Sequence, residues 1–189
     1  MPSKKIMEVG FQDFCYQNKR VRIVANRDCP EIKLAGLSIG PFEEGNEYEV
    51  YHWIAVELER SGIANRREEE QMNGTMLNKT QWAERVQTAK QISKLSQDFY
   101  PKLRRFLADL RVKTTGEPEK MRDYERIRDL TQDIVNSRLR KIVSIASAPA
   151  QTENTLRNLT PEERLLYGEL YNLISQWRGQ ILEHEGAKQ

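Results

Sequence analysis

The sequence contains few of the side chains on which metal sites, disulfide frameworks and histidine-based catalysis depend. Two cysteines, Cys15 and Cys29, and two histidines, His52 and His184, are spread over 189 residues and form no close pair. A structural zinc site needs four ligands in two close pairs, so we predict no metal site. No secretory leader pattern precedes the cysteines, which favours two reduced thiols, and a disulfide between them is left open.

Long apolar runs and phosphate-binding loops are also missing. No stretch approaches the ~20 consecutive apolar residues of a membrane-spanning helix, so no membrane contact is expected. Gly36 and Gly40 are closely spaced, but no lysine accompanies them and Pro41 comes directly after the second glycine. This fits neither a P-loop nor a dinucleotide-binding fingerprint. Because no nucleophile–base set is present either, the sequence predicts no cofactor and no enzymatic activity.

Charge of one sign is not in excess. The net charge is +2; residues 1–63 carry 8 basic and 10 acidic side chains, and residues 64–189 carry 22 and 18. A dedicated nucleic-acid-binding protein usually has a clear basic excess, so DNA contact is expected to be indirect or weak. The charged share of 31% beside a hydrophobic share of 38% is typical of long amphipathic helices covered with charge.

The first third of the chain has the alternating pattern of short strands. Strands are predicted at residues 19–25, 32–34 and 47–50, separated by turn residues, and a short helix is predicted from residue 51 to a C-terminal cap at Gly62. We therefore expect a small β-rich domain with a closing helix at residues 1–63. Residues 64–78, which hold a mixed charge run and an Asn-Gly pair, are predicted to be a linker.

Beyond the linker, apolar residues recur at steps of three and four, which predicts helices. The expected helices run from Trp82 to Leu95, through residues 99–110, through residues 119–147, and from Thr160 to Ile181. Thr160, Pro161 and Glu163 form a capping-box start for the last helix. The predicted fold class is α+β, with a larger, mainly α-helical bundle domain at residues 79–189.

One charged residue falls on an apolar helical stripe. Arg138 lies on the same face as the isoleucines of the 119–147 helix, so its guanidinium must meet a carboxylate or carbonyls from a neighbouring helix, within the chain or between chains. The apolar stripes exceed what four helices can bury among themselves, which predicts a subunit interface. The residues predicted for it are Ile127, Leu130, Ile134, Arg138, Ile142, Leu166, Leu170, Ile174 and Trp177.

A basic rim follows the helix predicted at residues 99–110. Lys102, Arg104 and Arg105 are candidate phosphate contacts, since an isolated contact to DNA needs only a few basic side chains. The alternative is a solvated helix face in which these side chains are balanced by nearby carboxylates.

Two blocks of the sequence are similar to one known family. In the first, the turn IGPF at residues 39–42 leads to a strand and then to a helix with the pattern W-x-A-x-x-L; its matching residues include Gly45, Val50, Trp53, Ala55 and Leu58. The second block contains Ile127, Leu130, Asp133, Ile134, Arg138, Lys141 and Ile142, followed by Asn158, Leu159, Thr160 and Glu163. In this order the blocks resemble the small β domain and the helical domain of GINS subunits of the β-domain-first type.

The resemblance implies a non-catalytic subunit of the GINS DNA-replication complex. Its compactness is similar to that of the archaeal counterpart of the second and third partner-of-Sld-five subunits. The implied partners are the other GINS subunit type, in a 2:2 heterotetramer, the MCM replicative helicase and a RecJ-like protein. The implied location is the cytoplasm, where the protein would be associated with the nucleoid at replication forks. The alternative is a free-standing DNA-binding module that uses the basic rim.

Overall fold

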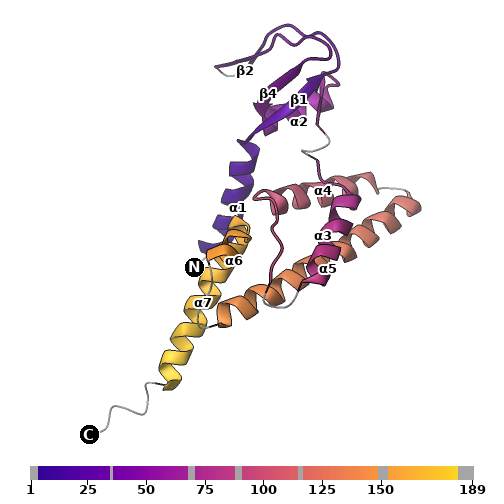
Figure 1. Cartoon of the computed structure of the whole chain (residues 1–189). Coiled ribbons are helices and arrows are strands. Elements are labelled where there is room, and N and C mark those ends of the chain that lie inside the picture. Colours follow the sequence, from indigo (N-terminus) through magenta and orange to yellow (C-terminus); the bar gives the residue numbers. More distant parts are fainter. Residues whose placement is uncertain are drawn as a thin grey trace. The chain divides into compact units, whose positions relative to one another are not determined.

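The computed structural model describes residues 4–34, 36–67, 71–87, 91–114, 117–148 and 153–182, with the side chains of 4–9 and 153–154 excepted. The chain divides into two compact units, Met1–Met72 and Asn73–Gln189. Strands occur in the first unit and long helices in the second, as the ribbon shows (Figure 1). The predicted α+β fold class, with the β-rich part first, is confirmed.

The N-terminal unit is built on a three-stranded antiparallel sheet in the order β4-β1-β5, beside a two-stranded antiparallel hairpin of β2 and β3. Its elements are α1 (Lys4–Gln17), β1 (Arg20–Ala25), β2 (Ile32–Leu34), β3 (Leu37–Ile39), β4 (Glu47–Tyr51), α2 (His52–Arg60) and β5 (Ala64–Arg66). The three predicted strands are confirmed within a residue at each end. The pattern did not reveal β3, which we expected to be loop.

The core of this unit lies between β1 and α2. Val21, Ile23 and Ala25 alternate along β1 and are buried on one face, as the period of two in a strand requires. They pack with Ile54 and Leu58 of α2. The helix ends as expected near Gly62, whose φ of +68° is accessible to glycine at low cost.

The predicted linker at residues 64–78 differs from the structure at both ends. Ala64 is buried opposite Ala25, so β5 adds a strand to the sheet instead of leaving it. Arg66 is held by an ion pair to Glu59 of α2, with Nη2 and Oε2 2.6 Å apart. At the other end, a helix already begins at Gly74. The segment between the two units is therefore shorter than the predicted linker. The burial of Ala64 and the ion pair of Arg66 explain this difference, and the mixed charge run in the sequence did not indicate either of them.

The helical unit is arranged around one long helix, α5 (Pro118–Ser147), which packs against three others. These are α3 (Gly74–Val86), α4 (Phe99–Lys113) and α7 (Pro161–Leu182), and a short α6 (Glu153–Arg157) precedes α7. The predicted capping box is confirmed, since the Thr160 N–H donates to Glu163 Oε2 at 3.0 Å and the Glu163 N–H to Thr160 Oγ1 at 3.3 Å.

The helix predicted from Trp82 to Leu95 is wrong in its second half. α3 ends at Val86. Ile92 and Leu95 are buried, but they belong to a non-helical segment at residues 91–96. Trp82 is 69% exposed, so the stripe to which it was assigned is not an interior face. The segment leaves the helical path because Ser93 meets the carboxylate of Glu84 in the interior. Residues 88–90, which belong to the predicted helix, lie outside the described residues.

Among the described residues, no helix has the length and apolar character needed to cross a membrane.

Candidate assembly site of the helical unit

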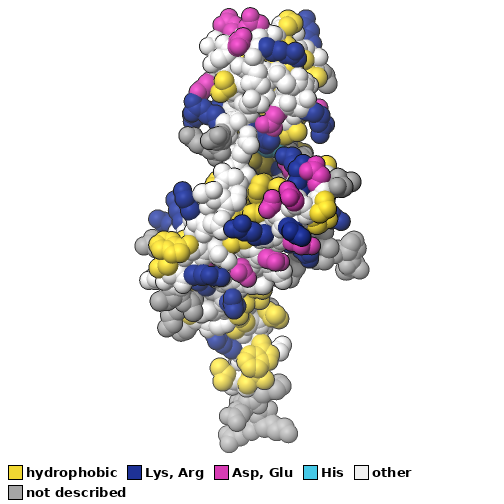
Figure 2. All heavy atoms as spheres, turned by 90° about the vertical axis from the view of Figure 1, so that its right-hand side faces the viewer, with side chains coloured by type: hydrophobic (Ala, Val, Ile, Leu, Met, Phe, Trp, Pro, Cys, Tyr) yellow, Lys and Arg dark blue, Asp and Glu magenta, His cyan; other side chains and the backbone are white. Residues whose placement is uncertain are grey.

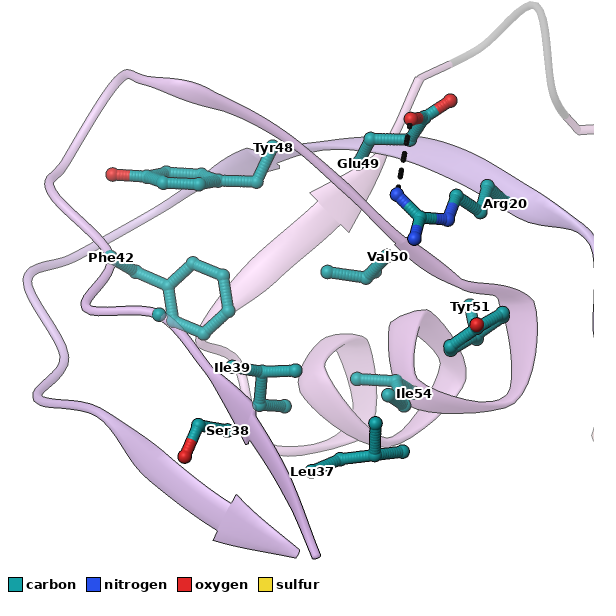
Figure 3. Close-up of a pocket in the computed structure, with 11 residues that line it drawn as sticks. Arg20, Leu37, Ser38, Ile39, Phe42, Tyr48, Glu49, Val50, Tyr51 and Ile54 are labelled. Atoms are coloured by element: carbon teal, nitrogen blue, oxygen red, sulfur yellow. Dashed lines mark ion pairs between the residues drawn. The ribbon is translucent and has the colours of Figure 1, made fainter.

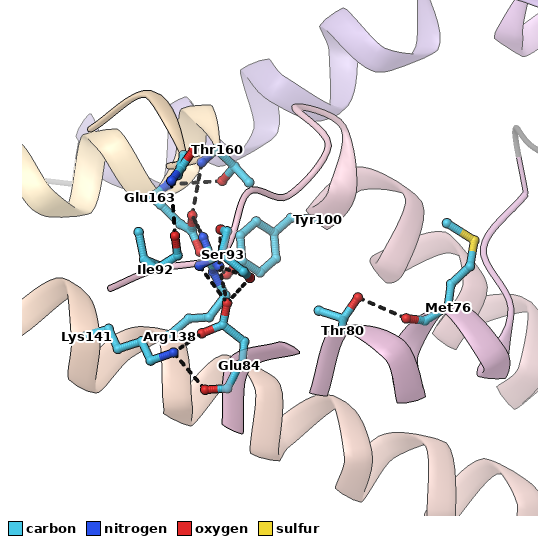
Figure 4. A network of polar contacts seen from close by, with 11 residues as sticks. Met76, Thr80, Glu84, Ile92, Ser93, Tyr100, Arg138, Lys141, Thr160 and Glu163 are labelled. Atoms are coloured by element: carbon cyan, nitrogen blue, oxygen red, sulfur yellow. Dashed lines mark hydrogen bonds and ion pairs between the residues drawn. The ribbon is translucent and has the colours of Figure 1, made fainter. Parts of the chain in front are cut away.

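The interior of the helical unit contains a cluster of charged side chains from three helices. Arg138 and Lys141 come from α5, Glu84 from α3 and Glu163 from the first turn of α7, and none is more than 5% exposed. Figure 4 shows the guanidinium of Arg138 between the two carboxylates. The prediction that Arg138 must find a carboxylate is confirmed, and both of its partners lie within the chain.

The contacts of Arg138 use the full fork of its guanidinium. Nη2 donates to Glu163 Oε2 at 2.6 Å and Nε to Glu163 Oε1, a two-pronged pair. Nη1 donates to Glu84 Oε1 at 2.6 Å and to the Ser93 carbonyl at 2.9 Å. Two-pronged pairs between arginine and carboxylate are geometrically specific, so the cluster fixes how α3, α5, α7 and the 91–96 segment meet.

The other members complete the cluster. Lys141 Nζ donates to Glu84 Oε2 and to the Glu84 carbonyl, both at 2.7 Å. The Tyr100 hydroxyl of α4 donates to Glu163 Oε1 at 2.8 Å. Two cations and two anions are therefore brought together without net charge, and each is hydrogen-bonded, which is the condition under which buried charges are tolerated.

The surroundings shift the protonation equilibria of this cluster. Burial opposes ionisation of Glu84, but hydrogen bonds from Lys141 and Ser93 and the charge of Arg138 outweigh it and lower the pKa of Glu84. Burial likewise opposes the charge of Arg138, and the hydrogen bonds and charge of Glu163 raise the pKa of Arg138 on balance. Burial and the Glu163 carboxylate raise the pKa of Tyr100. All three directions favour charged Glu84, charged Arg138 and a neutral phenol at pH 7.

The lowered pKa of Glu84 predicts an acid-sensitive contribution to stability. Because the folded pKa lies below the ordinary value of 4.5, the contribution is fully present above pH 4.5 and is lost as pH falls through the folded pKa. Glu84→Gln is expected to lower the melting temperature by several degrees at pH 7, and by progressively less below pH 4.5. Glu125→Gln, at an exposed position of α5, is the control. A difference that stays constant from pH 7 to pH 3 would contradict the assignment.

Three residues predicted for a subunit interface lie in the interior instead. Ile134, Arg138 and Ile142 are at most 2% exposed and are covered by elements of the same chain. Their face of α5 is occupied by α3, the 91–96 segment and α7, which are elements of the same chain. Ile127 and Leu130, earlier on α5, are half-buried. Sequence periodicity identified the apolar face correctly but could not show that this chain covers it.

The last helix keeps an apolar face in solvent. Leu173, Trp177 and Ile181 are 64%, 61% and 59% exposed and recur at every fourth residue of α7. Leu166 is exposed earlier on the helix, while Leu170 and Ile174 are half-buried. In Figure 2, apolar side chains gather at the lower end of the molecule, where α7 ends. A contiguous exposed apolar stripe on a fixed helix is typical of a surface that packs against another protein.

The basic rim is largely engaged with carboxylates. Lys102 pairs with Asp98 at 3.5 Å, and its side chain is only 11% exposed. Arg104 Nη2 lies 3.5 Å from Glu162 Oε1 of α7. Arg105 is half-buried and has an interaction of its own. The rim thus matches the alternative of a balanced helix face more closely than a row of cations open to phosphate.

The remaining candidates from the sequence have simple environments. Both cysteines are free thiols, Cys15 exposed and Cys29 half-buried. His52 is buried with its ring 4.6 Å from that of Tyr16 and with Nε2 3.3 Å from Arg66 Nη1, so it is part of the local packing. His184 lies outside the described residues.

Comparisons with known families agree with this architecture. Residues 71–182 match the Sld5 family model, the GINS complex protein helical bundle domain. That match covers more than half of the chain, and the chain belongs to the GINS family. It is therefore a non-catalytic subunit of the GINS complex of DNA replication, which associates with other GINS subunits.

The type of subunit follows from the other unit. Residues 11–65 match the PSF2 N-terminal domain, so the chain is PSF2-like, with its β domain ahead of the helical bundle. No curated protein sequence shows a significant match to the chain.

Proposed function

We propose that this GINS subunit is a scaffold that links the MCM replicative helicase to a RecJ-like partner at the replication fork. It does so within a 2:2 heterotetramer formed with the other GINS subunit type. In this proposal the protein is archaeal, is a replisome component and helicase accessory factor, and works in the cytoplasm with the nucleoid. Membership of the family and the division of the chain into two compact units support it.

The exposed stripe on α7 is the observation that carries the proposal. Leu173, Trp177 and Ile181 expose more than half of their surface on one helical face. Burying such side chains stabilises an interface by ~25 cal/mol per Å² of apolar surface, and tryptophan is prominent among interface hot spots. A helix of the other subunit type, with an apolar stripe of its own, is the expected partner.

The proposed interface is accordingly narrower on α5 and longer on α7 than the sequence alone suggested. Leu166, Leu170, Ile174 and Trp177 remain in it, and Leu173 and Ile181 extend it. On α5, Ile127 and Leu130 can contribute at its margin. Ile134, Arg138 and Ile142 support it from behind by fixing α5 against α3 and α7.

Co-expression with the other GINS subunit type tests the assembly. We expect a soluble complex whose mass in solution corresponds to two copies of each chain, whereas this chain expressed alone is expected to self-associate through its exposed stripe. A monodisperse monomer that does not bind the other subunit would contradict the proposal.

The links to other replication proteins need a separate measurement. Immobilised MCM and immobilised RecJ-like protein are each expected to retain the purified tetramer, and the tetramer is expected to bridge them. Titration of labelled duplex DNA with the tetramer at several salt concentrations tests the alternative function. Tight binding with a steep salt dependence that Arg105→Ala weakens would favour a DNA-binding module.

A further inference from the structure

A cavity of about 310 Å³ opens in the N-terminal unit between β3 and β4. Its walls are mainly apolar and include Leu37 and Ile39 of β3, Val50 of β4 and Ile54 of α2. Figure 3 shows these side chains converging on a common space, with Arg20 and Glu49 paired at its margin. Leu37 is 43% exposed, so part of this apolar lining faces solvent.

The cavity lies between two strands with unpaired edges. β4 is the outer strand of the three-stranded sheet, and β3 pairs only with β2 among the described strands. The Ala25 N–H donates to the Asn46 carbonyl and the His52 N–H to the Lys19 carbonyl. Because hydrogen-bonding pairs alternate along an antiparallel ladder, Tyr48 and Val50 direct their backbone groups to β1. Glu47, Glu49 and Tyr51 therefore direct theirs to the open edge.

We propose that this slot binds an extended segment of another protein. The backbone of that segment pairs with the open edge of β4, and its alternate apolar side chains enter the cavity beside Leu37 and Val50. Strand addition of this kind takes its affinity from main-chain hydrogen bonds and its specificity from pockets for every second side chain. The slot has both parts, since the backbone groups of Glu47, Glu49 and Tyr51, which pair with no other described strand, run along an apolar cavity.

The charge of the slot identifies the chemistry of the segment. Residues 28–51, which form β2, β3 and β4, contain six acidic side chains and one basic one. Arg20 and Arg67 pair with Glu49 and Glu47, so the uncompensated carboxylates lie towards the start of β4, where Glu43 and Glu44 are exposed. The expected occupant therefore alternates apolar residues and carries lysine or arginine at the end beside Glu43 and Glu44.

The same charges disfavour a second copy of this chain as the occupant. If the β4 edges of two copies paired, Glu47 and Glu49 would lie close to the same carboxylates of the other copy. Like charges opposite each other destabilise strand pairing, and charged side chains on an edge strand oppose edge-to-edge association. A basic segment reverses the sign of this interaction.

Glu49→Pro tests the proposal within the assembled GINS complex. Proline removes the Glu49 N–H, which faces the open edge, and leaves the hydrogen bonds between β4 and β1 in place. The probe is a labelled nine-residue peptide in which three valines alternate with threonines between two lysines at each end, and binding is followed by fluorescence anisotropy. Glu49→Ala keeps the N–H and is the matched control.

We expect saturable binding to the wild-type complex and at least about ten-fold weaker binding to Glu49→Pro, with less than about three-fold change in Glu49→Ala. Replacing the lysines of the peptide with glutamates should abolish binding. Leu37→Lys, which places a charge of the same sign as the peptide at the cavity, should match Glu49→Pro and serves if the proline variant does not fold. The proposal would be overturned if the wild type, Glu49→Pro and the Leu37 variant bound the peptide equally, or if the peptide showed no saturable binding to the wild-type complex. Further association of the wild-type complex, lost in Glu49→Pro, would instead identify a second copy as the occupant.

Discussion

Arg138→Ala is expected to lower the free energy of unfolding of the helical unit by about 3–5 kcal/mol, because it leaves two buried carboxylates without their shared cation. Glu84 would keep Lys141 as a partner, but Glu163 would lose both prongs of its contact to the guanidinium. Thermal unfolding of the complex, followed by calorimetry, measures the effect. The yield of assembled complex should fall in parallel, since Glu163 lies in the first turn of α7, the helix that carries the exposed stripe.

The controls for this variant come from the same helix. Arg140→Ala, at an exposed position two residues away, should change stability by no more than about 0.5 kcal/mol. Arg138→Lys should also be harmful, because an ammonium group cannot reproduce the planar fork that meets Glu163 and Glu84 together. Arg104→Ala is a poor control, since Arg104 faces the largely buried carboxylate of Glu162. If Arg138→Ala unfolds like the wild type, the ion cluster does not hold these helices together.

Trp177→Glu is expected to weaken association with the other GINS subunit type by at least about thirty-fold, as the loss of a hot spot worth about 2–4 kcal/mol implies. Trp177 is 61% exposed, so the variant should fold normally and its helix content, measured by circular dichroism, should equal that of the wild type. Sedimentation of mixtures over a range of concentrations measures the dissociation constant.

Gln176→Glu introduces the same charge at the neighbouring exposed position of α7 and is the matched control. It should assemble with nearly wild-type affinity because its side chain lies off the stripe of Leu173, Trp177 and Ile181. Equal weakening by the two variants would indicate a general effect of negative charge. Normal assembly of Trp177→Glu would place the interface on another face of the subunit.

Local patterns in the sequence determined much of the fold. Alternation located β1, β2 and β4, and the Thr160–Glu163 capping box located the start of α7, because each signal lies within a few residues. β5 could not be found in this way, since Ala64–Arg66 is a strand only because β1 offers it an edge. The non-helical segment at 91–96 could not be predicted for a related reason, since Ser93 contacts Glu84, nine residues away, and Arg138, 45 residues away along the chain.

The sequence predicted part of the ion cluster and part of the apolar interface. The position of Arg138 on an apolar stripe correctly implied a buried ion pair, since a guanidinium among isoleucines cannot remain unpaired. Glu163 was recognised only as a helix-capping residue, and Glu84 carried no local signal of its role. Periodicity also treated the faces of α5 and α7 alike. It cannot distinguish a stripe that the chain itself covers from one left for a partner, because both require the same residues at the same spacing.

Because the ion cluster joins three helices, the helical unit should fold completely before it associates with another subunit. No two of α3, α5 and α7 can satisfy the cluster alone, so a helical unit with one helix detached holds an uncompensated buried charge. Such partly folded forms should be scarce, and the unit should unfold in one cooperative transition. The exposed stripe of α7 is then displayed only by subunits whose interior is already complete. Only correctly folded chains would then bind another subunit. Arg138 would thus control assembly through folding, from a position inside its own chain.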